Sequence, residues 1–156
     1  FHLAQSEKPG AVHIELSEDV AKHRSLAGPL APAPSVQPEA NARELAKAAK
    51  LLRAAELPVI LAGNGLLRAG GTPQLIALSE STGIPVVNTF MGKGAIPASH
   101  PNCLFTLGLQ ARDVVGLALE EADVVLAVGY DLVEYHPKLW NRGRPKRVIS
   151  IDATAA

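Results

Sequence analysis

Short continuous apolar runs recur through most of the chain. They lie at 58–62, 84–87, 124–128 and 147–151, with a weaker one at 103–106. Runs of this length without polar alternation are typical of strands that are buried on both faces of a parallel sheet. The pattern therefore predicts four firm strands and a weaker fifth.

Segments of helical periodicity separate these runs. Leu45, Ala48, Ala49 and Leu52 follow the i, i+3, i+4, i+7 spacing, which predicts an amphipathic helix over 39–55. Two further helices are predicted. One is bracketed by Thr72-Pro73 and Gly83, and the other spans 112–122. Strands that alternate with helices indicate βαβ units with right-handed crossovers. The predicted fold class is α/β, a Rossmann-like parallel sheet flanked by helices.

The first part of the chain has a different pattern. Val12, Ile14 and Leu16 alternate with polar residues, which predicts a half-buried strand over 11–16. Residues 24–38 hold four prolines and no periodicity, which is typical of an extended linker. We therefore expect 1–23 to be the end of a neighbouring domain, 24–38 a linker and 39–156 the main domain. The strand over 11–16 should stay out of the main sheet and be covered by a neighbouring molecule or a surface groove.

Composition and charge exclude several classes of protein. The chain is 47% hydrophobic, and 15 basic residues balance 15 acidic ones. That balance argues against a strongly basic nucleic-acid binder. No apolar run approaches the ~18–20 residues of a membrane span. The single cysteine excludes an intrachain disulfide framework and a cysteine zinc cluster, and it favours a reducing compartment.

Candidate ligand contacts cluster after the strands. Ligands of open parallel sheets bind outside the carboxyl ends of the strands. These ends read Gly63-Asn64-Gly65, Asn88–Met91, Leu107–Gln110 and Gly129-Tyr130-Asp131. Arg68 stands where a dinucleotide fingerprint needs its third glycine, so Gly63–Gly65 is either a tight turn or a ligand contact. Asp152 is either a ribose-binding acid or a solvated strand end.

The sequence lacks the motifs of metal sites, serine nucleophiles and phosphate-binding P-loops. The five histidines show no metal-ligand spacing, so no metal site is predicted. No serine lies in a G-x-S-x-G elbow, and Gly92-Lys93 lacks the rest of a phosphate-binding P-loop. Cys103 is interpreted as a buried packing residue. Trp140 is expected to pack a loop onto the domain.

Three segments resemble thiamine-diphosphate enzymes of the acetolactate synthase group. They read PGAVHIELSEDV, GIPVVNTFMGKGAIPASHP and ADVVLAVGYDLVEYHPKLWN, at 9–20, 83–101 and 122–141. The resemblance implies that the first closes a pyrimidine-binding domain and that the other two lie in the central domain. The string from Gly129 to Asn141 resembles the catabolic acetolactate synthases most closely.

The resemblance also implies what lies elsewhere. The family's catalytic glutamate belongs to the upstream pyrimidine domain, and its G-D-G metal and diphosphate motif belongs to a downstream domain. No catalytic residue is therefore expected in this chain, and the thiamine diphosphate and Mg²⁺ sites are expected outside it. The full protein is expected to decarboxylate pyruvate and form 2-acetolactate, as a cytoplasmic homodimer or homotetramer that contains both flanking domains.

Some relatives bind FAD or an ADP group in the central domain, and the resemblance maps such contacts onto the strand ends. The mapped cofactor-binding residues are Gly63, Asn64, Gly65, Asn88, Thr89, Met91, Gly108, Gln110, Gly129, Asp131 and Asp152. Tyr130-Asp131 replaces the usual Ala-Arg pair, and Gln110 replaces a histidine. Losing the arginine removes a charge-assisted contact worth about 1.5–3 kcal/mol, so FAD binding is expected to be weak or absent.

Two alternatives remain open from the residues alone. The chain is a stand-alone nucleotide- or NAD-binding module, or a scaffold without a ligand. One fold hosts many functions, so the fold does not separate them. A stand-alone module has no need for an orphan strand and a proline-rich linker, so residues 1–38 favour the central-domain interpretation.

Overall fold

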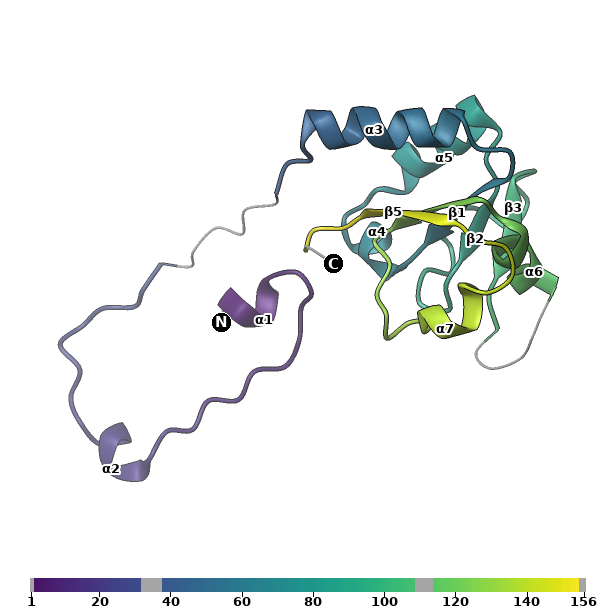
Figure 1. The fold of residues 1–156 in the computed structure, drawn as a ribbon. Helices are drawn as coiled ribbons and strands as arrows, with labels where there is room; N and C mark the ends of the chain where they lie inside the picture. Colours follow the sequence, from purple (N-terminus) through teal and green to yellow (C-terminus); the bar gives the residue numbers. More distant parts are fainter. Residues whose placement is uncertain (1, 32–37, 109–113, 155–156) are drawn as a thin grey trace. The chain divides into compact units, whose positions relative to one another are not determined.

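The computed structural model describes residues 2–31, 38–108 and 114–154. The chain divides into two compact units, Phe1–Pro38 and Glu39–Ala156 (Figure 1).

The first unit contains two short helices, α1 (His2–Gln5) and α2 (Glu18–Ala21). The strand predicted over 11–16 is not formed, and Ile14 and Leu16 are about two-thirds exposed, at 67% and 65%. An isolated extended segment has no neighbour for its backbone hydrogen bonds, so its alternating pattern does not produce a strand here.

The second unit is built on a parallel sheet, and the predicted α/β class is confirmed. The sheet order is β3-β2-β1-β4-β5, with all pairs parallel. The strands are β1 (Pro58–Ala62), β2 (Val86–Asn88), β3 (Cys103–Thr106), β4 (Val124–Val128) and β5 (Arg147–Ile151). None of the residues described in the first unit forms a strand of this sheet. The weaker run at 103–106 is a real edge strand.

Helices flank the sheet, and three of them were predicted from periodicity. The helices are α3 (Ala42–Arg53), α4 (Asn64–Arg68), α5 (Thr72–Thr82), α6 (Val114–Glu121) and α7 (Pro137–Trp140). The α3 helix begins later than predicted, because the Asn41 side chain caps it by accepting from the Arg43 N–H at 2.9 Å. Gly83 ends α5 in the left-handed conformation, as predicted, but Gly71 rather than Thr72 is the N-cap.

Two apolar layers cover the sheet. On one face, Ile60 and Leu126 pack with Leu66 of α4 and Leu75 of α5. On the other face, Leu61 packs with Leu119 of α6 and Trp140 of α7, among others. Successive strand residues point to opposite layers, which explains why the strands are continuous apolar runs. Trp140 is 3% exposed and packs onto the domain, as predicted, but it does so from the short helix α7 and not from a loop.

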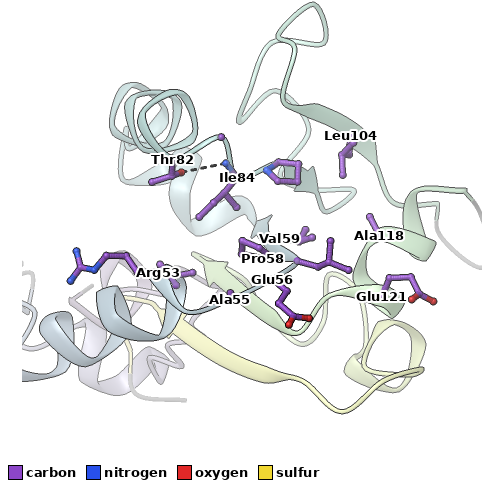
Figure 2. Close-up of a pocket in the computed structure, with 14 residues that line it drawn as sticks. Arg53, Ala55, Glu56, Pro58, Val59, Thr82, Ile84, Leu104, Ala118 and Glu121 are labelled. Atoms are coloured by element: carbon purple, nitrogen blue, oxygen red, sulfur yellow. Dashed lines mark hydrogen bonds between the residues drawn. The ribbon is translucent and has the colours of Figure 1, made fainter.

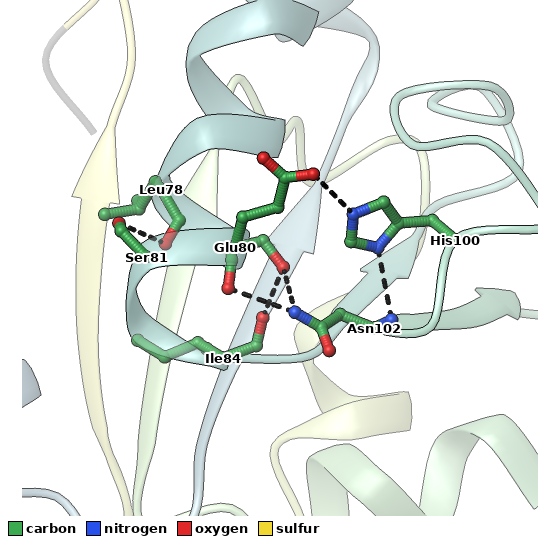
Figure 3. Close-up of polar contacts among 7 residues, drawn as sticks. Leu78, Glu80, Ser81, Ile84, His100 and Asn102 are labelled. Carbon is green, nitrogen blue, oxygen red and sulfur yellow. Dashed lines mark hydrogen bonds and ion pairs between the residues drawn. The ribbon is translucent and has the colours of Figure 1, made fainter.

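A buried polar cluster fixes the segment that enters β3 (Figure 3). The Ser79 hydroxyl of α5 donates to the Ile84 carbonyl at 2.8 Å, and the Asn102 amide donates to both oxygens of Ser79 at 3.0 Å. His100 accepts from the Asn102 N–H at 3.1 Å, and its other ring nitrogen lies 3.5 Å from the Glu80 carboxylate. The edge strand β3 is therefore tied to α5 as well as to β2.

Candidate functional site at the carboxyl edge of the sheet

The sheet topology brings most of the predicted contacts to one edge. β1 lies between β2 and β4, so the residues after these three strands meet. The Thr89 N–H donates to the Ala62 carbonyl, and the Gly63 N–H donates to the Val128 carbonyl, both at 2.9 Å. Strand order reverses between β1 and β4, which is where a doubly wound sheet usually holds its ligand.

The glycines at this edge are required by backbone packing. A Cβ on Gly63 would lie 2.4 Å from the Gly129 carbonyl oxygen, and one on Gly129 would lie 2.1 Å from the Leu66 nitrogen. Gly129 also has a positive φ of 56°. The Gly65 N–H donates to the Gly129 carbonyl at 2.8 Å. The chain's own contacts thus account for all three glycines, and Gly63 caps α4 rather than forming a simple turn.

A buried carboxylate, which the sequence reasoning did not identify, joins the three strand ends. Glu134 is 7% exposed. Its two oxygens lie 3.0 and 3.2 Å from the Asn64 nitrogen, which donates to them. The Thr89 hydroxyl donates to the same carboxylate and accepts from the Gly92 N–H at 2.9 Å. The only sequence signal for this role was an acidic residue inside the apolar stretch that follows β4.

An aromatic pair stands beside this carboxylate. The rings of Tyr130 and Trp140 are 5.9 Å apart and nearly perpendicular, and the Trp140 ring N–H donates to the Tyr130 hydroxyl at 3.1 Å. Burial raises the pKa of Tyr130, and the charges of Glu134 and Asp131 raise that pKa further, against the Trp140 hydrogen bond. The electrostatic environment on this side of the edge is therefore negative.

The remaining predicted residues are less concentrated. Asp131 and Asp152 each accept from a backbone N–H two residues onward at 3.2 Å. Met91 is 48% exposed. Asn88 is 3% exposed, and its side-chain oxygen lacks a hydrogen-bond partner among the described residues. Gly108 follows β3, and the predicted contact at Gln110 lies outside the described residues.

The described residues offer neither a group of metal ligands nor an exposed cysteine nucleophile. Within residues 2–31, 38–108 and 114–154, no three His, Cys, Asp or Glu side chains are grouped to hold a metal ion. Cys103 is buried in the apolar layer, as predicted. No helix in the described part of the chain is long and apolar enough to cross a membrane.

A cavity of about 690 Å³ lies at the opposite edge of the sheet (Figure 2). Its walls are the C-terminal ends of α3, α5 and α6 and the segments that begin β1 and β2, including Pro58 and Ile84. Arg53 and Glu56 are among its few charged residues, and the Glu56 carboxylate is 3.7 Å from Arg144. The sequence did not predict this cavity, and its mainly apolar lining does not indicate a reaction.

Comparison with known families decides the assignment of the fold. The family described as "Thiamine pyrophosphate enzyme, central domain" matches residues 45–156. The chain belongs to this family. The resemblance inferred from the sequence is thereby confirmed, and the central-domain interpretation is favoured over a stand-alone NAD-binding module.

Curated relatives of this central domain are much longer proteins. An acetolactate synthase of Mycobacterium bovis is 38% identical over 133 residues, which are 83% of this chain and 22% of that protein. A probable acetolactate synthase large subunit of Methanocaldococcus jannaschii is 36% identical over 136 residues, covering 83% and 23%. A glyoxylate carboligase of Escherichia coli O157:H7 is 34% identical over 158 residues, covering 97% and 26%. The chain thus spans about a quarter of the length of these relatives.

Proposed function

We propose that the protein containing this chain converts pyruvate to 2-acetolactate, and that this chain is its non-catalytic central domain. The observation that carries the proposal is the match at 36–38% identity to acetolactate synthases from a bacterium and an archaeon. Thiamine diphosphate, with Mg²⁺, supplies the carbanion chemistry when bound. The residues of this chain would set the spacing between the domains that hold that cofactor.

The division of the chain is part of the same proposal. Residues 1–23 would end a pyrimidine-binding domain, 24–38 would be the linker, and 39–156 would be the central domain. The separation of the chain into the units Phe1–Pro38 and Glu39–Ala156 supports a boundary after residue 38. We propose that the whole protein is cytoplasmic and works as a homodimer or homotetramer.

The test compares the parent protein with the 156-residue chain. With thiamine diphosphate, Mg²⁺ and pyruvate, the parent should form acetolactate, and the chain alone should form none above a buffer control. The chain contains no G-D-G sequence, which supports its inactivity. Acetolactate formation by the chain alone would contradict the non-catalytic assignment. A parent protein that is inactive with pyruvate would contradict the proposed activity.

Glyoxylate is the second candidate substrate. The relative named glyoxylate carboligase matches more of this chain than the acetolactate synthases do, although its identity is lower. The same assay with glyoxylate in place of pyruvate, followed by release of CO₂, compares the two candidates. A higher kcat/KM for glyoxylate would favour the second.

A further inference from the structure

The hydrogen-bond donors at the carboxyl edge of the sheet bind acceptors of the same chain. An anion at this place in a doubly wound fold is normally held by backbone N–H groups at the start of the helix after β1. Here the Asn64 N–H donates to the Glu134 carboxylate, and the Gly65 N–H donates to the Gly129 carbonyl. The Thr89 hydroxyl, at the end of β2, also donates to Glu134. These three donors, which belong to predicted cofactor contacts, already have partners within the chain.

The backbone also closes the space between the ends of β1 and β4. A single methyl group on Gly63 would lie 2.4 Å from Gly129 and 2.6 Å from the Tyr130 Cα. A phosphate group is larger than a methyl group. It cannot enter between these segments unless one of them moves.

Charge works in the same direction. Residues 128–136 contain Asp131 and Glu134 but no lysine or arginine. The buried side-chain oxygen of Asn88 is a hydrogen-bond acceptor. An ionised phosphate oxygen is also an acceptor, so it cannot donate a hydrogen bond to Asn88. At the end of β4, a phosphate would therefore meet carboxylates instead of a cation.

We propose that Glu134 is an internal substitute for a bound anion, and that this edge of the domain is closed to FAD, ADP and other phosphate-bearing ligands. The carboxylate reaches from the segment after β4 to the ends of β1 and β2 and satisfies the donors that a nucleotide would otherwise satisfy. Asn64, Gly65 and Thr89, which were mapped as dinucleotide contacts, thus brace the sheet edge. The proposal goes beyond the carboligase activity and does not depend on which keto acid the parent protein uses.

Ligand binding provides the first test. The 156-residue chain is titrated with FAD, followed by flavin fluorescence, and with ADP, followed by calorimetry, at low ionic strength. We expect no saturation by either ligand at concentrations up to about 0.1 mM. Saturable binding below that concentration that shifts the Asn64 and Gly65 amide signals in an NMR spectrum would place the ligand at this edge and overturn the proposal. Saturation that leaves those two signals unchanged would place the ligand elsewhere and leave this edge closed, as proposed.

Substitution of the carboxylate provides the second test. Glu134→Gln keeps the size of the side chain but removes its charge and replaces one of the two oxygens that accept from Asn64 with an NH2 donor. We expect the melting temperature to fall by about 5 °C or more, since buried charge-assisted bonds are lost. Glu121→Gln removes the same charge from an exposed position and should change it by less than about 1 °C. Equal effects of the two substitutions would overturn the proposal.

Chemical rescue separates an internal anion from an ordinary packing residue. Glu134→Ala removes the carboxylate and leaves its donors without partners. Formate should raise the melting temperature of this variant more than sodium chloride does at the same ionic strength, and wild type should show no such difference. Equal responses of variant and wild type to formate would overturn the proposal. If Glu134→Ala does not fold, formate is tested on Glu134→Gln with the same criterion.

Discussion

Gly129→Ala and Gly83→Ala form a matched pair that isolates the close packing of the β1 and β4 ends. Both glycines have a positive φ, 56° at Gly129 and 71° at Gly83. A Cβ on Gly83 meets nothing within 4 Å, whereas one on Gly129 would lie 2.1 Å from the Leu66 nitrogen and 2.5 Å from the Gly65 carbonyl carbon. The two substitutions therefore share the conformational cost and differ in the steric one.

The expected magnitudes follow from these contacts. Placing an L-residue in the left-handed region costs about 1–2 kcal/mol. Reduced entropy of the unfolded chain returns about 0.4–1 kcal/mol, so Gly83→Ala should destabilise by at most about 1.6 kcal/mol. At Gly129 the backbone must separate, which breaks the 2.8 Å bonds to Gly65 and Ile151. Each buried group left unpaired costs about 1–3 kcal/mol, so we expect a total loss of about 3–6 kcal/mol.

Urea unfolding followed by tryptophan fluorescence measures both losses. Trp140 is the only tryptophan and is buried inside the second unit, so its fluorescence reports on the unfolding of that unit. An unchanged m value would show that the variants unfold from the same compact state. Losses that agree within about 0.5 kcal/mol would refute the argument, because they would mean that the β1 and β4 ends separate without cost.

Three further predictions test other parts of the molecule. Deletion of residues 1–38 should change the melting temperature of the second unit by less than about 2 °C, because none of the residues described among them forms a strand of its sheet; a fall of about 10 °C would contradict their separation into a distinct unit. Ser79→Ala should destabilise by about 1–2 kcal/mol in urea unfolding, because the Ile84 carbonyl loses its donor, whereas the exposed control Ser81→Ala should cost less than about 0.5 kcal/mol. Desolvation opposes ionisation of Asp123, but the N–H groups of Glu56 and Leu57 hold its pKa below the ordinary 3.8. Its stabilising contribution is therefore complete above pH 3.8 and is lost as the pH falls through the lowered pKa. The stability difference between wild type and Asp123→Asn should shrink over that acidic range, and a constant difference would contradict the assignment.

The strands were predictable because strands buried on both faces consist of consecutive apolar residues. Each of 58–62 and 124–128 is apolar throughout, since both of its faces lie under helices. The strand over 11–16 was wrong for the complementary reason. Its alternating apolar residues would give a strand with one apolar face. A strand also needs a neighbouring segment for its backbone hydrogen bonds, and no described segment pairs with 11–16.

The candidate edge was predictable only in position. Strand ends can be read from the apolar runs, and the topology rule places ligands beside them. The role of Glu134 could not be read in this way, because its partners at Asn64 and Thr89 are 70 and 45 residues away in sequence. The α4 helix was missed for a related reason. Gly63-Asn64-Gly65 has the composition of a turn, and contact with Gly129 makes it the start of a helix.

The central position of β1 also affects how the protein is made. Leu57 precedes β1, and its N–H bonds to the side chain of Asp123, 66 residues later, at the start of the neighbouring strand β4. A ribosome that adds ~5–20 residues per second needs roughly 3–13 s to synthesise that interval. For most of this time Val59 and Leu61 lack the strand β4 and the helix α6 that later bury them. This segment therefore stays accessible to a chaperone until β4 has been made.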